Sequence, residues 1–460
     1  MSGEPSTPRR GAAPEPTPTD PAPTSNASAS SRAPVPTFGP PCEPPWWASN
    51  GQLQTLAGHL LPSDAPPLSR APRFEVELAD GDRLAVHALE GTSDTRVVLV
   101  HGLSGDVDSD YMRRTALVAQ RLGHHVWAVN LRNAGSGRGL SRRPYHSGCV
   151  ADLRAVLELS HAQSPHLRRV LVGFSLSGNL ALLVAAGVTP QPSRQLPPVR
   201  EPSSPHSNSR VDSLAPAAPH APDSRIASLP AEPPSTLSSG SASSPLHPAP
   251  ALGSASAFAP ASALPPGSSL APTPALAPTS ALTPASAVAP ASAVAPASAV
   301  APAPVPCEAV LAINPPVDLA SAADRTHRGF NRLYELRFVA RLRRDITLLA
   351  RSGLHPTAPI GPFTTLRDLD DRFTAPVSGF ASAAEYYERC SSLPHLARIR
   401  VPTVILTSLD DPLVDATPLL TAPLSPSTQL HAEPHGGHMG YLSRRAPLRW
   451  LDTALRHYLA

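Results

Sequence analysis

The chain has 460 residues and a formal net charge of +3 at pH 7, and 60 of its residues are proline. This length allows two or three domains, but so much proline with only 4% aromatic residues indicates a folded part diluted by low-complexity sequence. All basic side chains are arginine and none form a basic block, which argues against nucleic acid as a partner.

Cysteine spacing and hydropathy indicate the compartment in which the protein is expected and whether it spans a membrane. The four cysteines are scattered without paired spacing, which predicts neither a disulfide framework nor a metal site. The sequence has no run of about 18 apolar residues, and its first residues lack the apolar core of a signal peptide. We therefore expect a cytoplasmic protein without a transmembrane segment.

The amino-terminal part predicts a tail followed by a helix and a hairpin. Residues 1–43 are rich in Pro, Ser and Ala and cannot repay the entropy of folding, so we expect them to be disordered. Order is expected to begin near Pro44–Trp47, and Asn50–Leu56 is typical of a short helix. Apolar and polar residues then alternate over Phe74–Leu78 and Arg83–His87, which predicts a β-hairpin.

Continuous apolar runs replace this alternation after the hairpin. Three such runs, Val97–Val100, His125–Asn130 and Val170–Phe174, are typical of strands buried on both faces of a parallel sheet. Helical spacing of apolar residues separates them over Tyr111–Leu122 and again over Val150–Leu157. The alternation of strands and helices predicts an α/β fold with a mostly parallel, doubly wound sheet.

A long low-complexity insertion interrupts this domain. Residues 190–306 consist mainly of Pro, Ala and Ser, and such a composition predicts disorder because it offers no face to bury. The domain is thus predicted in two parts, residues 44–189 and 307–460. The insertion follows the crossover helix that comes after the Val170–Phe174 strand. We therefore expect it to leave the domain at the amino edge of the strands, opposite the carboxyl edge where the candidate site described below is expected.

The carboxy-terminal part predicts a cap and the last strands. A strand over Ala309–Asn314 is followed by a mostly helical excursion, about residues 319–400, that is expected to cover the carboxyl edge of the sheet. Strands are predicted at Thr403–Thr407 and Gln429–His431, with a closing helix over Arg445–Tyr458.

The most informative motif is Gly173-Phe174-Ser175-Leu176-Ser177-Gly178, between a strand and a helix-forming run. This context is typical of a nucleophile elbow, where the serine hydroxyl projects from a sharp turn and the next N–H can bind an oxyanion. Ser175 is therefore the candidate nucleophile and Leu176 a candidate oxyanion donor. The alternative is that Ser175 only caps the helix. Ser177 stands where the motif normally has glycine.

A serine nucleophile needs a base and an acid, which follow it in that fold in the order Ser, acid, His. Asp411 follows the Thr403–Thr407 strand before Pro-Leu-Val and is the candidate acid, with Asp410 and Asp318 as alternatives. His438 lies in the glycine-rich loop after the last strand and is the candidate base, preferred over His435 because glycines flank it.

The second oxyanion donor is expected in the loop after the first parallel strand. His101-Gly102-Leu103 ends that strand, and the Leu103 N–H is the candidate donor because the glycine keeps the backbone accessible.

With these residues in place, the chain resembles the YheT-like branch of the α/β-hydrolases, a group of carboxylesterases and lipid-acting relatives. The motifs that carry the resemblance are Asn50–Leu56, His101–Gly105, Asn130–Gly137, Tyr145–Gly148 with Asp152-Leu153, Gly173–Gly178, Pro316–Leu319, Asp370–Thr374, Tyr386-Tyr387, Asp410–Pro412 and Gly436–Tyr441. The chain departs from the family at Ser177, at Asn133-Ala134 in place of Gly-Cys, and in its long insertion.

The resemblance implies an α/β-hydrolase fold with a helical cap and a Ser175–Asp411–His438 triad that needs no cofactor. It implies hydrolysis of short- or medium-chain carboxylic esters, or of monoacylglycerol-like lipids, through an acyl-enzyme. Two alternatives stay open: an acyltransferase on the same triad, and a non-catalytic binding protein of the same fold. We expect a monomer whose partner is a small ester or lipid, and peripheral contact with a membrane is compatible with that.

Overall fold

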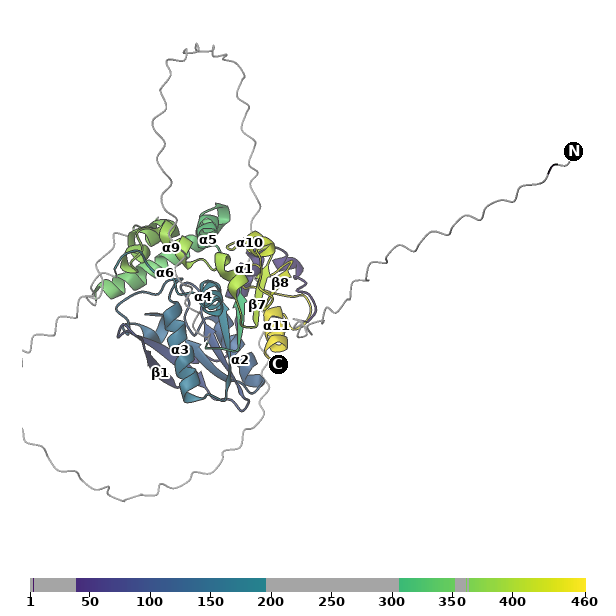
Figure 1. The fold of residues 1–460 in the computed structure, drawn as a ribbon, viewed down its shortest axis with the longest axis horizontal. Coiled ribbons are helices and arrows are strands. Elements are labelled where there is room, and N and C mark those ends of the chain that lie inside the picture. The colour runs from purple at the N-terminus through teal and green to yellow at the C-terminus, as the bar shows by residue number, and fades with distance from the viewer. Residues whose placement is uncertain (1–2, 4–38, 196–305, 352–360, 362–363) are drawn as a thin grey trace, which may run out of the picture. The chain divides into compact units, whose positions relative to one another are not determined.

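The computed structural model describes residues 3, 39–195, 306–351, 361 and 364–460 (Figure 1). Most of the predicted amino-terminal tail, residues 1–43, and most of the predicted insertion, residues 190–306, lie outside these ranges, as do residues 352–360 of the predicted cap. The boundaries of the predicted domains therefore stay predictions.

An eight-stranded sheet forms the centre of the described domain, with strand order β1-β2-β4-β3-β5-β6-β7-β8. Its strands are β1 (Arg73–Glu77), β2 (Arg83–Leu89), β3 (Thr95–Val100), β4 (His125–Val129), β5 (Arg168–Phe174), β6 (Ala309–Ile313), β7 (Thr403–Ser408) and β8 (Thr428–Glu433). The hairpin β1–β2 and the β2–β4 pair are antiparallel, and all other neighbours are parallel. This arrangement confirms the predicted fold class.

Six helices lie outside the cap: α1 (Gly51–Leu60), α2 (Asp110–Arg121), α3 (Val150–Gln163), α4 (Leu176–Ala185), α10 (Thr417–Thr421) and α11 (Trp450–Leu459). The side chain of Asn50 caps α1 by accepting a hydrogen bond from the Leu53 N–H at 3.0 Å. The closing helix was predicted to begin at Arg445, which is wrong. A β-bridge between Leu442 and Arg449 holds the intervening residues as a loop.

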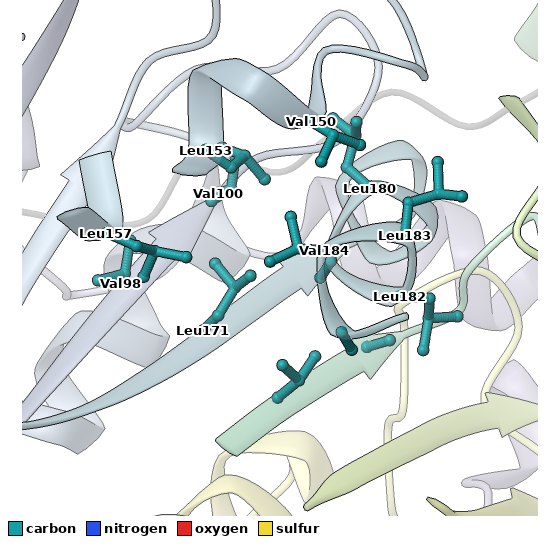
Figure 2. Close-up of a cluster of buried hydrophobic side chains, with 14 of the residues drawn as sticks. Val98, Val100, Val150, Leu153, Leu157, Leu171, Leu180, Leu182, Leu183 and Val184 are labelled. Carbon is teal, nitrogen blue, oxygen red and sulfur yellow. The ribbon is translucent and has the colours of Figure 1, made fainter. Parts of the chain in front are cut away.

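Both faces of the sheet are covered, because successive side chains of a strand point to opposite faces. On one face Val98 and Val100 of β3 lie in the same apolar cluster as Leu153 of α3 and Leu180 of α4 (Figure 2). On the other face Leu99 belongs to a second cluster that contains residues of α2 and α11. Burial on both faces explains why the parallel strands read as continuous apolar runs.

The cap contains α5 (Leu319–Thr326), α6 (Arg332–Arg351), α7 (Leu366–Leu369), α8 (Ala375–Val377) and α9 (Ala383–Cys390), with one π-helical turn at Asp370–Thr374. Figure 1 shows α5, α6 and α9 gathered at one end of the sheet. Several hydrogen bonds join the cap to the domain below, among them those from the Asn179 side chain to the Cys390 carbonyl at 2.8 Å and from the Ser147 N–H to Tyr386 Oη at 2.9 Å. The predicted helical cap is thus confirmed.

The two chain ends that border the insertion lie in different places. The Arg194 N–H donates to the Gly379 carbonyl at 2.9 Å, and Arg389 of α9 donates to the Gln191 carbonyl at 3.0 Å, so the first end lies against the cap. The Glu308 N–H donates to the Arg169 carbonyl at 2.9 Å, so the second end lies at the amino edge of the sheet. The prediction that the insertion leaves at the amino edge is wrong for the first end, because the chain that follows α4 lies against α9 of the cap.

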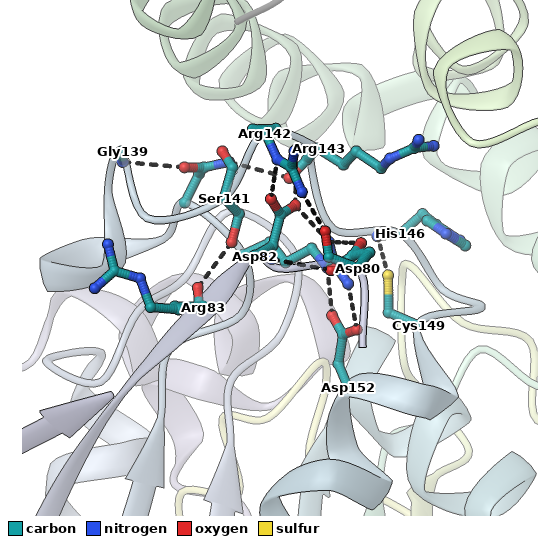
Figure 3. Close-up of polar contacts among 12 residues, drawn as sticks. Asp80, Asp82, Arg83, Gly139, Ser141, Arg142, Arg143, His146, Cys149 and Asp152 are labelled. Atoms are coloured by element: carbon teal, nitrogen blue, oxygen red, sulfur yellow. Dashed lines mark hydrogen bonds and ion pairs between the residues drawn. The ribbon is translucent and has the colours of Figure 1, made fainter. Parts of the chain in front are cut away.

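A charge cluster around Arg132 joins the β1–β2 turn to α3, and Figure 3 labels its three carboxylates, Asp80, Asp82 and Asp152. The Arg132 guanidinium donates to both oxygens of Asp152 at 2.7 Å, and its Nη1 donates to Asp80 and Asp82, also at 2.7 Å. Asp82 and Asp152 are only 2% and 3% exposed. Arginine suits this position because its planar fork donates in several directions at once. The cluster fixes the start of the loop that carries His146 toward the candidate site.

We expect Arg132→Met to lower the free energy of unfolding by about 3–5 kcal/mol, because it leaves the buried Asp152 carboxylate without a counter-charge, although Asp82 keeps its ion pair with Arg142. Urea unfolding monitored by circular dichroism measures this change. The matched control is Arg138→Met, since the Arg138–Asp345 pair is exposed and such pairs contribute at most about 1 kcal/mol. Equal losses in the two variants would contradict the assigned role of Arg132.

Candidate active site

The turn between β5 and α4 holds Ser175 in a conformation that few residues adopt. Its φ is 50° and its ψ is −119°, and its N–H donates to the Ile313 carbonyl of β6 at 2.8 Å. Gly173 is required just before the turn, since a Cβ there would lie 2.1 Å from the Ser177 carbonyl oxygen. The close crossing of strand and helix thus forces the serine out of the sheet edge, as the motif predicts.

The structure brings the three candidate triad residues together. His438 Nε2 lies 2.9 Å from Ser175 Oγ, and His438 Nδ1 lies 2.8 Å from Asp411 Oδ2. An ionised carboxylate only accepts hydrogen bonds, so Nδ1 carries the proton and Nε2 accepts from the Ser175 hydroxyl. This tautomer is the one a general base needs.

Asp411 is fully buried and its carboxylate is held from several sides. Its Oδ1 accepts from the N–H groups of Leu413 and Val414 at 2.8 and 3.0 Å, and its Oδ2 accepts from the Asn314 side chain at 2.7 Å. Tyr441 Oη donates in turn to Asn314 Oδ1 at 2.9 Å. These contacts fix the direction in which the carboxylate meets His438.

The alternative residues have other partners. Asp410 Oδ1 accepts from the N–H groups of Gly436 and Gly437 at 3.0 and 2.8 Å, so it supports the loop that carries His438. His435 Nδ1 lies 3.3 Å from the same Asp410 carboxylate and is not next to Ser175. Asp318 caps α5 by accepting from the Ser321 N–H at 3.0 Å.

The two candidate oxyanion donors have free N–H groups. Within the described residues, the N–H groups of Leu103 and Leu176 donate to no protein acceptor. The neighbouring amides are used: the Gly102 N–H donates to Tyr111 Oη at 3.0 Å, and the Ser104 N–H donates to Tyr145 Oη at 2.8 Å. The loop therefore leaves the Leu103 N–H available for a ligand.

His101 fixes this loop from below. It is fully buried, its Nδ1 donates to the Gly102 carbonyl at 2.8 Å, and its Nε2 accepts from the Leu131 N–H at 3.1 Å. Burial lowers the pKa of His101, so the imidazole is neutral in this role.

A cavity of about 710 Å³ opens above Ser175 and His438, a volume within the usual range for small-molecule sites. Apolar side chains from the cap form much of its lining, among them Leu319, Ala322, Leu333, Phe338 and Leu342. His146 and Asp370 also line it. Burial lowers the pKa of His146 to about 3, with a contribution from Arg132, and burial raises the pKa of Asp370 to about 6.

Three supporting residues were not identified from the sequence: Asn314, Tyr111 and Tyr145. Asn314 directly follows β6 at the same sheet edge as Ser175, so its position at the end of the predicted strand Ala309–Asn314 could have indicated it. No spacing marks Tyr111 or Tyr145, because each reaches the oxyanion loop from a different element.

Neither a metal-binding cluster nor a membrane-spanning helix is present in the described part of the chain. No three His, Cys, Asp or Glu side chains gather there in a group that could hold a metal ion. None of its helices has the length and apolar character needed to cross a membrane.

Sequence comparison identifies the class of protein. The alpha/beta hydrolase fold family matches residues 95–194, which include β3, the loop with Leu103, and the elbow at Ser175. Together with the strand order, this match shows an α/β-hydrolase fold.

Part of the chain is similar in sequence to YheT and to monoacylglycerol lipases. It is 30% identical over 163 residues to "Putative esterase YheT" of Escherichia coli (strain K12), covering 34% of this chain and 48% of that protein. It is 36% identical over 104 residues to "Monoacylglycerol lipase ABHD2" of Homo sapiens, covering 21% of this chain and 24% of that protein. The aligned part thus spans about half of YheT and a quarter of ABHD2.

The chain also matches solved structures of esterases. The Pyrococcus furiosus esterase Pf2001 has a TM-score of 0.40 at 12% identity, covering 81% of this chain and 84% of that chain.

The half-buried position of His146 at the cavity wall predicts a pH-dependent stability. Because its pKa falls from 6.5 to about 3 on folding, the unfolded chain binds a proton between these values that the folded chain does not. Stability is therefore lost as the pH falls below about 6.5. We expect His146 to account for about 1–2 kcal/mol of the loss between pH 7 and pH 5.

Urea unfolding at both pH values compares the wild type with His146→Phe and His146→Gln, neither of which titrates at this position. Both variants should lose less stability on acidification than the wild type. An unchanged pH dependence in both would contradict the prediction.

Proposed function

We propose that the protein hydrolyses carboxylic esters through an acyl-enzyme, with Ser175 as the nucleophile. The observation that carries this proposal is the His438 imidazole, 2.9 Å from Ser175 Oγ on one side and 2.8 Å from Asp411 on the other. A serine hydroxyl is a weak nucleophile until an oriented base takes its proton, and these contacts supply that base.

The proposed reaction uses each group in turn. Ser175 Oγ bonds to the ester carbonyl carbon while its proton passes to His438 Nε2, and Asp411 stabilises the imidazolium that forms. The Leu103 and Leu176 N–H groups donate to the oxyanion. The imidazolium then protonates the leaving alcohol, and water releases the acyl group by the same steps.

For the substrate we propose short- or medium-chain esters or monoacylglycerol-like lipids. Two observations favour this substrate class. Apolar side chains of the cap line the cavity and could contact an acyl chain, and the names of the aligned relatives include an esterase and a monoacylglycerol lipase. Contact with a membrane surface that holds such lipids is compatible with this proposal. The cytoplasmic location and monomeric state expected from the sequence stay predictions.

The assignment of the triad can be tested by substituting Ser175 and each of the two adjacent aspartates, Asp410 and Asp411. Ser175→Ala should abolish ester hydrolysis, and Asp411→Asn should lower kcat by about 10⁴-fold because His438 then adopts the wrong tautomer. Asp410→Asn is the matched control: its amide oxygen can still accept from the Gly436 and Gly437 N–H groups, so we expect a loss below about tenfold. Hydrolysis of p-nitrophenyl butyrate measures all three.

Thermal unfolding shows whether each variant is folded. Turnover that persists in a folded Ser175→Ala would point to another nucleophile. Equal losses in the two aspartate variants would contradict the assignment of the acid.

The cavity predicts a dependence on acyl-chain length. For p-nitrophenyl esters of increasing length, kcat/KM should rise by up to about fourfold per methylene while the chain is being buried, and then level off. Ala322→Phe should move this plateau to shorter chains, because residue 322 lines the cavity. Hydrolysis of the acetate should fall least. The same plateau in both proteins would contradict acyl binding beneath α5.

A further inference from the structure

Ser177 makes a contact that the usual glycine at this position could not make. It lies in the first turn of α4, it is fully buried, and its hydroxyl donates to the main-chain carbonyl of His101. This bond joins the nucleophile elbow directly to the loop after β3. The two segments are 76 residues apart in sequence.

The bonded carbonyl belongs to the His101–Gly102 peptide, whose other side is also held. The Gly102 N–H donates to Tyr111 Oη at 3.0 Å. A peptide unit is planar, so bonds at its oxygen and at its N–H together fix its rotation. The loop also passes close to the nucleophile, because a Cβ on Gly102 would lie 3.0 Å from the Ser175 Cβ.

The next peptide is the one that matters for an oxyanion. Its carbonyl, from Gly102, accepts from His101 Nδ1 at 2.8 Å and from the Gly105 N–H at 3.1 Å. Its N–H, from Leu103, has no acceptor within the described residues. Rotation of the His101–Gly102 peptide would turn this N–H as well, because the two units share the Gly102 Cα.

We propose that Ser177 is a positioning residue that holds the Leu103 N–H toward the oxyanion formed at Ser175. This proposal rests on the proposed function. When Ser175 Oγ bonds to the carbonyl carbon, the carbonyl π electrons move to oxygen and the proton moves to His438. A donor stabilises that oxygen only if it is already aimed at it. The serine therefore assists turnover, and replacing it by the usual glycine lowers kcat.

The test compares Ser177→Ala and Ser177→Gly in the full chain. Loss of a direct oxyanion donor lowers kcat by about 10²–10³, so loss of its positioning should lower kcat by about tenfold with little change in KM. Ser177→Ala is the primary variant, since glycine also weakens a helix. Ser392→Ala is the matched control, because Ser392 is equally buried and its hydroxyl has no partner among the described residues.

A second readout separates positioning from packing. A trifluoromethyl ketone adds to the nucleophilic serine and forms an oxyanion at the same place. Its inhibition constant should rise in the Ser177 variants by about the same factor by which kcat/KM falls, and should not change in Ser392→Ala. Thermal unfolding confirms that the variants are folded.

The outcomes distinguish this proposal from the proposed function. If the wild type neither hydrolyses esters nor reacts with a fluorophosphonate at Ser175, the proposed function fails. If the wild type is active and both Ser177 variants match it in kcat and in inhibitor affinity, only the role of Ser177 is overturned. Lower kcat with unchanged inhibitor affinity would also overturn it.

Discussion

The close crossing of β5 and α4 is the constraint on which the site depends. Strand and helix meet so tightly at Gly173 that no side chain fits there, and the backbone of Ser175 adopts a positive φ as a result. Such a turn is strained and persists only where its surroundings hold it. Here the hydrogen bond to Ile313, the burial of α4 and the Ser177 contact with His101 provide that support.

The rest of the site is arranged so that polar groups near Ser175 have fixed partners. Asp411 is surrounded by donors, and the loop of His101 has its amides satisfied by tyrosine hydroxyls. In a buried setting an unpaired polar group is unfavourable, so a complete network strongly favours one geometry. Within the described residues, the N–H groups of Leu103 and Leu176 and the Ser104 hydroxyl are exceptions, and the two N–H groups lie where the proposed chemistry needs donors.

Much of this arrangement could be predicted from the sequence because parallel strands place their carboxyl ends at one edge. Ser175, Asp411 and His438 each follow a predicted strand, so the fold alone suggests that they meet. The choice of Asp411 over Asp410 depended on a neighbouring Pro-Leu-Val run, and in the structure the N–H groups of that run bind the carboxylate.

Other features depend on contacts between distant elements, and the sequence analysis did not assign their roles. Tyr111 and Tyr145 reach the oxyanion loop from different segments. The hydrogen bond from the Asn314 side chain to Asp411 follows from no residue spacing. The first border of the insertion was misplaced because the route of a connection after a helix is set by tertiary contacts, here those with α9.

The pairing of β5 with β6 has a consequence for how the protein is made. It joins strands on either side of the insertion, and the residues of the Ser175–His438 contact are 263 positions apart in sequence. At about 5–20 residues per second, a ribosome needs roughly 10–50 s to go from one to the other. During that interval the nascent chain carries the elbow without its imidazole. Until β6 has been synthesised, the edge of β5 has no strand with which to pair.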